Sequence, residues 1–200
     1  MGVQHLQDGS ESSVAFESAN FAAREAFRPA YDRLAEVLMA TLEFQSALDV
    51  GCGQGFLVDA LLAHGIDVQG IEMSHSALAF ASPQAAERIQ IGNALWANVS
   101  VPFDLVCCVE VAEHVEPQHS RRLVTKLCEL AKGPIYFTAA SPYQPGHGHI
   151  NCRPSVDWIY FFHENGWTLD IDKTIDIRAR LGSLEAAPWI SMNTMLFIKE

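Results

Sequence analysis

Residues 47–56 read ALDVGCGQGF, an apolar segment that runs into three glycines at alternate positions. The segment Ser46–Val50 predicts a short buried strand, and Gln54–His64 predicts a helix that ends at Gly65. Glycines between a strand and a helix permit a tight turn and let the backbone approach a ligand closely. The N–H groups that begin such a helix point at an anionic group. The stretch therefore predicts a ligand site at the end of this strand.

Strands and helices alternate along the rest of the chain. Further strands are predicted at Ile66–Ile71, Arg88–Ile91, Phe103–Val109, Pro134–Ala139, Trp167–Ile171 and Met192–Lys199. Helices are predicted from Phe27 to Leu38, at Ser74–Ala81, from Pro117 to Gly133, and at Pro154–Asn165. This spacing is typical of parallel strands joined by helical crossovers, so the predicted class is α/β with a doubly wound sheet. The region Lys173–Pro188 shows no clear helical pattern, and we interpret it as a long connection between two antiparallel strands.

Length and composition predict one globular domain. The chain has 200 residues, of which 49% are hydrophobic and 18% charged. A chain of this length buries enough surface to form one core without disulfides or a structural metal. The first residues are polar, so we predict a flexible segment over 1–20 and a single domain over 21–200.

The charge and the cysteines exclude several classes of protein. The net charge of −11 opposes the binding of phosphate backbones, so no nucleic-acid partner is expected. No apolar run approaches ~18 residues, and Met1–Ser13 lacks the features of a signal peptide, so no membrane association is expected. Five cysteines, an odd number, predict reduced thiols and a cytoplasmic protein.

An acidic residue accompanies the glycine stretch. Glu72 ends the next predicted strand, where its carboxylate can accept hydrogen bonds from both hydroxyls of a ribose. Dinucleotide-binding proteins carry the spacing G-x-G-x-x-G/A, but the sixth position here is Phe56, which is too large for that packing. A nucleoside ligand other than a dinucleotide is therefore expected.

The glycine spacing resembles the first motif of the class I S-adenosylmethionine (SAM)-dependent methyltransferases. Residues 70–72 (GIE) resemble the ribose-binding motif of that family, and residues 91–94 (IGNA) resemble its adenine-edge motif. Asn93 stands where the family commonly has Asp, and an amide can still accept from the adenine amino group. Residues 103–115 (FDLVCCVEVAEHV) resemble the fourth-strand motif of the small-molecule branch, which includes the ubiquinone-type O-methyltransferases.

The resemblance implies a fold, a cofactor and the residues that bind it. The implied fold is the Rossmann-like methyltransferase fold, a mostly parallel seven-stranded sheet with an antiparallel last strand. The implied cofactor is SAM, with S-adenosylhomocysteine (SAH) as product. The implied cofactor-binding residues follow the motifs: Asp49, Gly51, Cys52, Gly53, Gly55, Glu72, Met73, Asn93, Ala94, Leu95 and Glu110.

Three histidines are candidate catalytic bases, because histidine exchanges protons near pH 7. His114 lies in the Glu-His element after the fourth strand, and His147 and His149 lie in the loop after the fifth strand. A Gly-His-x-Asn stretch like residues 148–151 occurs in some methyltransferases of this branch. Structural roles remain open for all three: His114 as a helix-entry residue, and the other two as parts of a polar loop.

Other residues are candidates for substrate contact or metal binding. Three residues are predicted to contact the substrate: Tyr31, Tyr143 and Asn151. For Tyr31, packing in the core is an equally good explanation. The spacing of His147, His149, Cys152 and His163 is not one of the usual zinc arrangements, so no metal is predicted.

The predicted function is transfer of a methyl group from SAM to a small-molecule acceptor, at oxygen rather than nitrogen, by a monomer or homodimer. Two alternatives stay open. One is a protein or nucleic-acid methyltransferase on the same fold, which a basic groove or an NPPY-type loop would support. The other is a SAM-binding module without catalysis.

Overall fold

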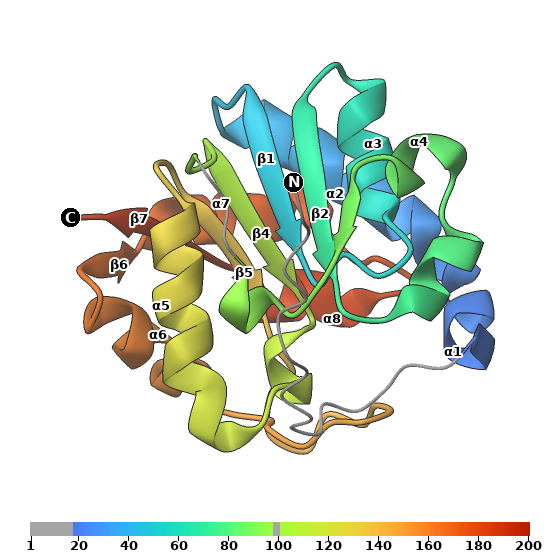
Figure 1. Cartoon of the computed structure of the whole chain (residues 1–200). Helices are drawn as coiled ribbons and strands as arrows, with labels where there is room; N and C mark the ends of the chain where they lie inside the picture. Colours follow the sequence, from blue (N-terminus) through green and yellow to red (C-terminus); the bar gives the residue numbers. More distant parts are fainter. Residues whose placement is uncertain (1–17, 98–100) are drawn as a thin grey trace, which may run out of the picture.

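The computed structural model describes residues 18–97 and 101–200 as one seven-stranded sheet covered by helices on both faces (Figure 1). The strand order is β3-β2-β1-β4-β5-β7-β6. The strands are β1 Ser46–Val50, β2 Asp67–Glu72, β3 Ile89–Ile91, β4 Leu105–Val109, β5 Ile135–Thr138, β6 Trp167–Leu169 and β7 Met195–Lys199. The first five strands are parallel, and β7 runs antiparallel to both β5 and β6. This topology confirms the predicted fold class.

Two helical layers cover the sheet. One layer contains α2 Arg28–Thr41, α3 Phe56–Ala63, α7 Ile171–Leu181 and α8 Pro188–Asn193, and the other contains α5 Ser120–Leu130 and α6 Ser155–His163. Successive residues of a strand point to opposite faces. In β4 this sends Cys107 into the first layer's core and Val106 and Cys108 into the second, so both sides of the strand are buried.

Short elements complete the part of the chain that the structure describes. Two are α-helical, α1 Ser18–Ala23 and α4 Pro83–Ala86. Five are 3-10 helices, at Arg24–Phe27, His75–Phe80, Ala94–Trp96, Ala112–His114 and Pro117–His119. The 3-10 helices at residues 75–80, 94–96 and 112–114 follow the ends of β2, β3 and β4, at the edge of the sheet where α/β proteins bind ligands. No helix in the described ranges is long and apolar enough to cross a membrane.

The prediction of a long connection over Lys173–Pro188 is wrong. Helix α7 begins at Ile171. The side chain of the preceding residue, Asp170, caps it by accepting a hydrogen bond from the Lys173 N–H at 2.9 Å. The helix ends at Leu181, because the next residue, Gly182, has a φ of 60°. Thr174, Ile177 and Leu181 form its buried face. The β-branched residues Ile and Thr have low helix propensity, and burial against the sheet and α2 overrides that preference.

Smaller differences concern element boundaries. Residues 75–80 form a 3-10 helix rather than the α-helix predicted over Ser74–Ala81. Strand β7 begins at Met195 rather than Met192, because α8 continues to Asn193. The division into a flexible segment over 1–20 and a domain over 21–200 stays a prediction: residues 1–17 lie outside the described residues, and α1 begins at Ser18.

Candidate active site

The three glycines after β1 have two different roles. All of them have positive φ, between 55° and 79°. A Cβ at Gly51 would lie 2.5 Å from Val111, and a Cβ at Gly55 would lie 2.8 Å from Ala85, so these two glycines permit close packing. A Cβ at Gly53 would meet nothing nearer than 3.9 Å, where it approaches Arg24. Packing therefore leaves room at the middle glycine, where an added Cβ would lie at ordinary contact distance from Arg24 and Phe21.

Glu72 connects this loop to the end of β2. Its Oε2 accepts a hydrogen bond from the Gly53 N–H at 2.9 Å, and its Oε1 accepts one from the Ser74 N–H at 2.7 Å. Gly70 lies beside Cys52, because a Cβ at Gly70 would be 2.5 Å from the Cys52 sulfur. The predicted ribose-binding carboxylate and the glycine loop thus lie at the same edge of the sheet.

Asp49 is a buried acid at the end of β1. Burial, and secondarily the negative charge of Glu72, raises the pKa of Asp49 to about 7, while the positive charge of Arg24 opposes the shift. A buried carboxyl with this pKa is poised to ionise beside a cationic ligand.

The predicted adenine contacts follow β2 and β3. Asn93 Oδ1 accepts a hydrogen bond from the Leu95 N–H at 2.9 Å and so caps the short helix Ala94–Trp96. Leu95 is buried, and Met73 is 41% exposed. The Asn93 side-chain oxygen therefore already has one structural partner, the Leu95 N–H.

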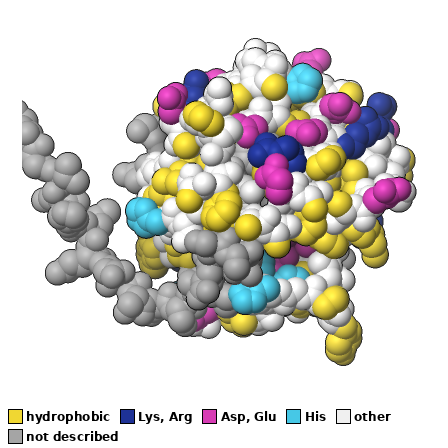
Figure 2. Space-filling view, turned by 90° about the vertical axis from the view of Figure 1, so that its right-hand side faces the viewer, with side chains coloured by type: hydrophobic (Ala, Val, Ile, Leu, Met, Phe, Trp, Pro, Cys, Tyr) yellow, Lys and Arg dark blue, Asp and Glu magenta, His cyan; other side chains and the backbone are white. Residues whose placement is uncertain are grey.

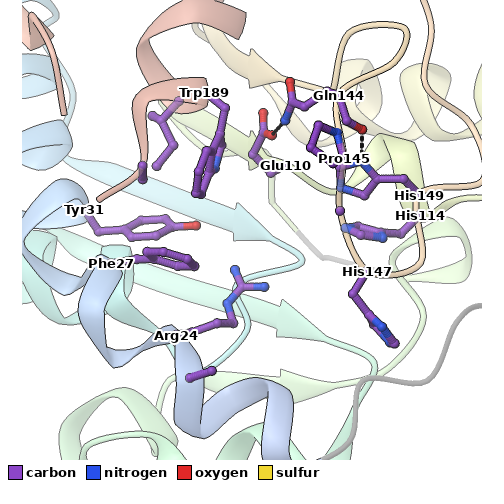
Figure 3. A pocket seen from close by; sticks show the side chains of 14 residues that line it. Arg24, Phe27, Tyr31, Glu110, His114, Gln144, Pro145, His147, His149 and Trp189 are labelled. Atoms are coloured by element: carbon purple, nitrogen blue, oxygen red, sulfur yellow. Dashed lines mark hydrogen bonds between the residues drawn. The ribbon is translucent and has the colours of Figure 1, made fainter. Parts of the chain in front are cut away.

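A cavity of about 390 Å³ lies next to the glycine loop (Figure 3). Arg24, Phe27 and Tyr31 form one side of the cavity, and Trp189 continues this wall. The opposite side carries polar groups from the ends of β4 and β5. The remaining lining residues are Ala23, Glu110, His114, Gln144, Pro145, Gly146, His147, His149, Ala187 and Ile190. All three histidines predicted from the sequence thus line one cavity, together with Tyr31 and Glu110.

Glu110 is held between two amides. Its backbone has a φ of 53°, and its carboxylate accepts hydrogen bonds from Gln144 Nε2 and Asn193 Nδ2, each at 3.0 Å. The Asn193 amide also donates to Gln144 Oε1 at 3.0 Å. The resulting triangle joins β4, the loop after β5 and helix α8, three segments that are distant in sequence.

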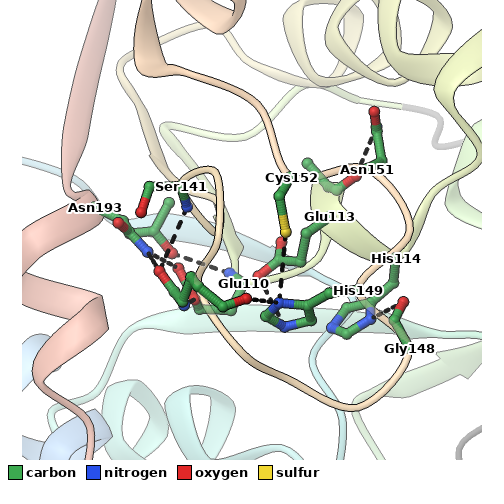
Figure 4. Close-up of polar contacts among 12 residues, drawn as sticks. Glu110, Glu113, His114, Ser141, Gly148, His149, Asn151, Cys152 and Asn193 are labelled. Carbon is green, nitrogen blue, oxygen red and sulfur yellow. Dashed lines mark hydrogen bonds and ion pairs between the residues drawn. The ribbon is translucent and has the colours of Figure 1, made fainter.

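Two of these histidines contact backbone carbonyls through their rings (Figure 4). The ring Nδ1 of His114 lies 3.1 Å from the Gly148 carbonyl, and Nδ1 of His149 lies 3.1 Å from the Gln144 carbonyl. A carbonyl only accepts hydrogen bonds, so each of these two contacts requires a proton on Nδ1. Burial lowers the pKa of His114 to about 4, so its ring is neutral at pH 7. His147 is exposed at the cavity.

Behind these histidines lies Glu113, which is fully buried. Neither of its carboxylate oxygens has a hydrogen-bond partner within the described part of the chain. The Oε1 atom of Glu113 lies 4.0 Å from Nε2 of His149. Burial, and secondarily the charge of Glu110, raises the pKa of Glu113 well above its ordinary value.

Two predicted substrate residues do not reach the cavity. The Tyr143 side chain is fully exposed, at a φ of 69°, and Tyr143 is not among the lining residues. Asn151 is buried, donates to the Ala112 carbonyl and to Ser120 Oγ at 3.1 and 2.9 Å, and accepts from Arg153 at 2.7 Å. Its contacts are structural: they attach the histidine loop to the protein.

Several site residues have no strong signal in the sequence. Gln144, Asn193 and Trp189 reach the site only through tertiary packing. Arg24 precedes the first predicted helix, and no local motif marks it. Glu113 is part of the fourth-strand stretch, but its burial behind His149 depends on the fold.

Sequence comparison shows a similarity to one protein family. The model of a protein family described as a methyltransferase domain matches residues 47–133, which extend from β1 to the residues just after α5. This range, less than half of the chain, is thus similar to methyltransferase domains. The matched range contains the glycine loop, Glu72, Glu110 and His114, whereas the loop with His147 and His149 lies beyond it.

Relatives and solved structures show similarities of the same kind. Ubiquinone biosynthesis O-methyltransferase of Coxiella burnetii is 34% identical over 107 residues, or 49% of this chain and 44% of the relative. The enzyme of the same description from Albidiferax ferrireducens is 39% identical over 80 residues, or 36% of this chain and 31% of the relative. The matched part of this chain thus spans less than half the length of these relatives.

Two solved structures share the fold over nearly the whole chain. Magnesium protoporphyrin IX methyltransferase from Synechocystis PCC 6803, with bound SAH, has a TM-score of 0.68 and 17% identity, and the match covers 96% of this chain and 90% of that one. The sugar N-methyltransferase KedS8 from Streptoalloteichus has a TM-score of 0.67 and 15% identity, and the match covers 100% and 99% of the two chains. The elements outside residues 47–133 therefore also follow the class I methyltransferase fold.

Proposed function

We propose that this protein transfers a methyl group from SAM to the oxygen of a small-molecule acceptor. The observation that carries the proposal is the continuity between the glycine loop and the histidine-lined cavity. Arg24 lines that cavity, and its guanidinium lies 3.9 Å from the position of a Cβ at Gly53. A ligand on the loop and a ligand in the cavity would therefore meet.

In this proposal, SAM lies along the carboxyl ends of β1 to β3. Arg24 pairs with the carboxylate of the methionine part, and Asp49 accepts from its ammonium group. Glu72 accepts from the ribose hydroxyls, and Asn93 with Leu95 borders the adenine. Each of these roles uses a charge or a hydrogen-bonding atom that faces the same edge of the sheet.

The reaction itself is an in-line displacement. The acceptor oxygen attacks the methyl carbon, the bond from that carbon to sulfur breaks, and its electron pair stays on the sulfur of SAH. Most of the rate comes from holding the two molecules at near-attack distance. A hydroxyl must also lose its proton, and Nε2 of His114 or His149 is the nearby basic atom.

The site supports a small acceptor more than a macromolecule. A volume of about 390 Å³ is at the lower end of the range for small-molecule pockets. On the face shown in Figure 2, basic side chains lie beside acidic ones and form no continuous basic groove. The O-methyltransferase relatives favour oxygen as the target, whereas the likeness to a sugar N-methyltransferase keeps an amine acceptor as the second candidate.

A product assay tests the proposal. The protein is incubated with SAM and, separately, with panels of phenols, aliphatic alcohols and amines, and SAH is quantified by mass spectrometry. Acceptor-dependent SAH is expected with at least one hydroxyl compound, together with a product heavier by one methyl group. SAM binding without SAH from any panel would instead favour the non-catalytic SAM-binding module.

A further inference from the structure

The 3-10 helix Arg24–Phe27 brings Arg24 to the glycine loop. Arg24 lines the cavity, and its guanidinium lies 3.9 Å from the position of a Cβ at Gly53 (Figure 3). All four residues of this helix are exposed or only partly buried. A 3-10 helix of about one turn has little stability of its own, so contacts with other elements must hold it in place.

One anchor of this helix is apolar and precedes it in the chain. Phe21 of α1 is 2% exposed, and its ring stacks on that of Phe80 with 6.2 Å between the ring centroids. This contact attaches α1 to the 3-10 helix that follows β2. Apolar contact is non-directional, so it does not by itself set the direction in which Arg24 points.

The second anchor is polar and follows the helix, at the first residue of α2. Arg28 Nε donates to Glu25 Oε1 at 2.6 Å, and Arg28 Nη1 donates to Asp59 Oδ2 at 3.2 Å. Asp59 belongs to the first turn of α3, the helix that follows the glycine loop. The planar guanidinium holds its donors at fixed angles, so one side chain sets the 3-10 helix relative to α3.

Two further contacts support this polar anchor. The Arg28 guanidinium carbon lies 4.4 Å from the centroid of the Phe56 ring, and Phe56 is the first residue of α3. The other Asp59 carboxylate oxygen accepts a hydrogen bond from Ser82 Oγ at 2.5 Å. The Arg28 and Asp59 side chains are only 32% and 18% exposed, so their attraction is screened less than that of a pair on the open surface.

Glu25 is also held from the glycine loop. Gln54, which is part of that loop, is 2% exposed, and its Nε2 donates to Glu25 Oε2 at 3.5 Å. The Glu25 carboxylate thus joins Arg28 on one side and the glycine loop on the other. Because Arg24 directly precedes Glu25, these contacts fix the backbone from which the Arg24 side chain extends.

We propose that Arg28 is a positioning residue for SAM binding, which holds Arg24 over the glycine loop without contacting the cofactor. This inference rests on the proposed function, in which Arg24 pairs with the carboxylate of the methionine part. Arg28 is not among the residues that line the cavity. Without the two hydrogen bonds of Arg28, SAM would have to order the 3-10 helix on binding, and this ordering would reduce its affinity.

Calorimetric titration of the full chain with SAM and with SAH tests the proposal. Arg28→Met keeps an unbranched stem over Phe56 but removes both hydrogen bonds, and we expect SAM and SAH to bind about tenfold more weakly. Arg28→Lys keeps the charge but lacks the planar fork, so its loss of affinity should be smaller. The matched control is Arg33→Met on the same helix, which removes hydrogen bonds to Glu36 at 2.9 Å and to the Arg180 carbonyl at 2.8 Å. Its affinity for SAM should stay within about twofold of the wild type.

A double-mutant cycle distinguishes positioning from a general loss of stability. Because Arg28 acts through Arg24 in this proposal, Arg28→Met should weaken SAM binding by less than about twofold in an Arg24→Ala background. A fully additive loss, or wild-type SAM affinity in Arg28→Met, would overturn the inference. Arg28→Lys provides the same test if the Tm of Arg28→Met shows that this variant folds poorly.

The inference and the proposed function can fail separately, because SAM binding is measured without an acceptor. Absence of acceptor-dependent SAH would contradict the proposed function and leave the positioning of Arg24 intact. Unchanged SAM affinity in Arg24→Ala would overturn the inference, whereas acceptor-dependent SAH would still support the proposed function. Where an acceptor is found, Arg28→Met should raise KM for SAM and leave kcat unchanged, and a lower kcat at unchanged KM would contradict a positioning role.

Discussion

The two ends of the cavity are built in different ways. At the glycine loop, polar groups are paired locally: both carboxylate oxygens of Glu72 accept backbone N–H groups from residues within 19 positions of it in the sequence. The other end of the cavity is lined by His114, His147 and His149, and we call it the histidine wall. Its contacts join distant segments, such as Glu110 with Asn193, which are 83 positions apart. That wall also contains Glu113, whose oxygens have no described hydrogen-bond partner. The first region thus pairs its polar groups locally, whereas the second depends on contacts between distant segments.

The largest expected effect is at the glycine loop. Gly51→Ala places a Cβ 2.5 Å from Val111 on a backbone with a φ of 76°. Positive-φ strain and overpacking together should lower the free energy of unfolding by about 2–4 kcal/mol, as measured by urea denaturation. Gly65→Ala is the matched control, because its φ is 80° but nothing lies within 4 Å of the added Cβ. Gly65→Ala should lower the free energy of unfolding only by the backbone strain, about 1–2 kcal/mol. An equal decrease in both variants would show that the contact with Val111 is unimportant.

Loss of the Glu72 carboxylate should come next. Glu72→Ala leaves the Gly53 and Ser74 N–H groups without their acceptor, and in the proposed role it also removes the acceptor for the ribose hydroxyls. SAM binding measured by calorimetry should weaken by about 1–3 kcal/mol. The exposed Glu87→Ala serves as the control for a change in net charge. Unchanged affinity in Glu72→Ala would remove the ribose role from this residue.

A smaller effect should appear as pH dependence of cofactor binding. The pKa of Asp49 is raised to about 7 in the folded protein, so its protonated form stabilises the fold at low pH, and this contribution is lost as pH rises through 7. A cationic ligand favours the ionised form, so SAM affinity should instead rise from pH 6 to 8, by roughly up to tenfold if only that form binds.

Asp49→Asn separates this effect from other titrating groups. Glu113, whose pKa is also raised, contributes in the same direction to the pH dependence of Tm. In Asp49→Asn, SAM affinity should therefore depend less on pH, while part of the decrease in Tm with rising pH should remain. A wild-type SAM affinity that is constant between pH 6 and 8 would contradict the role of Asp49.

The smallest effect is expected at the triangle of hydrogen bonds that joins Glu110, Gln144 and Asn193. Asn193→Ala removes two hydrogen bonds of 3.0 Å, to Glu110 and to Gln144, and should cost about 0.5–1.5 kcal/mol in unfolding free energy. Because the change is on the histidine wall, KM for the acceptor should rise while SAM affinity stays the same. The exposed neighbour Met192→Ala is the control. Weaker SAM binding in Asn193→Ala would mean that the two ends of the cavity are coupled.

Prediction from sequence succeeded where the signal was local. The strand before Gly51, the acid at the end of β2 and the crossover pattern are short-range features, and the sheet confirms them. The prediction failed at α7, where Ile and Thr obscure a helix that tertiary burial stabilises. It also placed Tyr143 and Asn151 at the substrate, because a loop pattern does not tell which side chains point inward.

The sequence by itself determined the class of fold, the glycine loop and the candidate histidines, because periodicity and turn chemistry act over a few residues. Only the tertiary structure decided which groups face one another across the cavity: Arg24 beside the glycine loop, Asn193 against Glu110, and Glu113 behind His149. The physical reason is that electrostatics and desolvation depend on distance in space, and the chain brings these residues together only when helices and strands pack around the sheet.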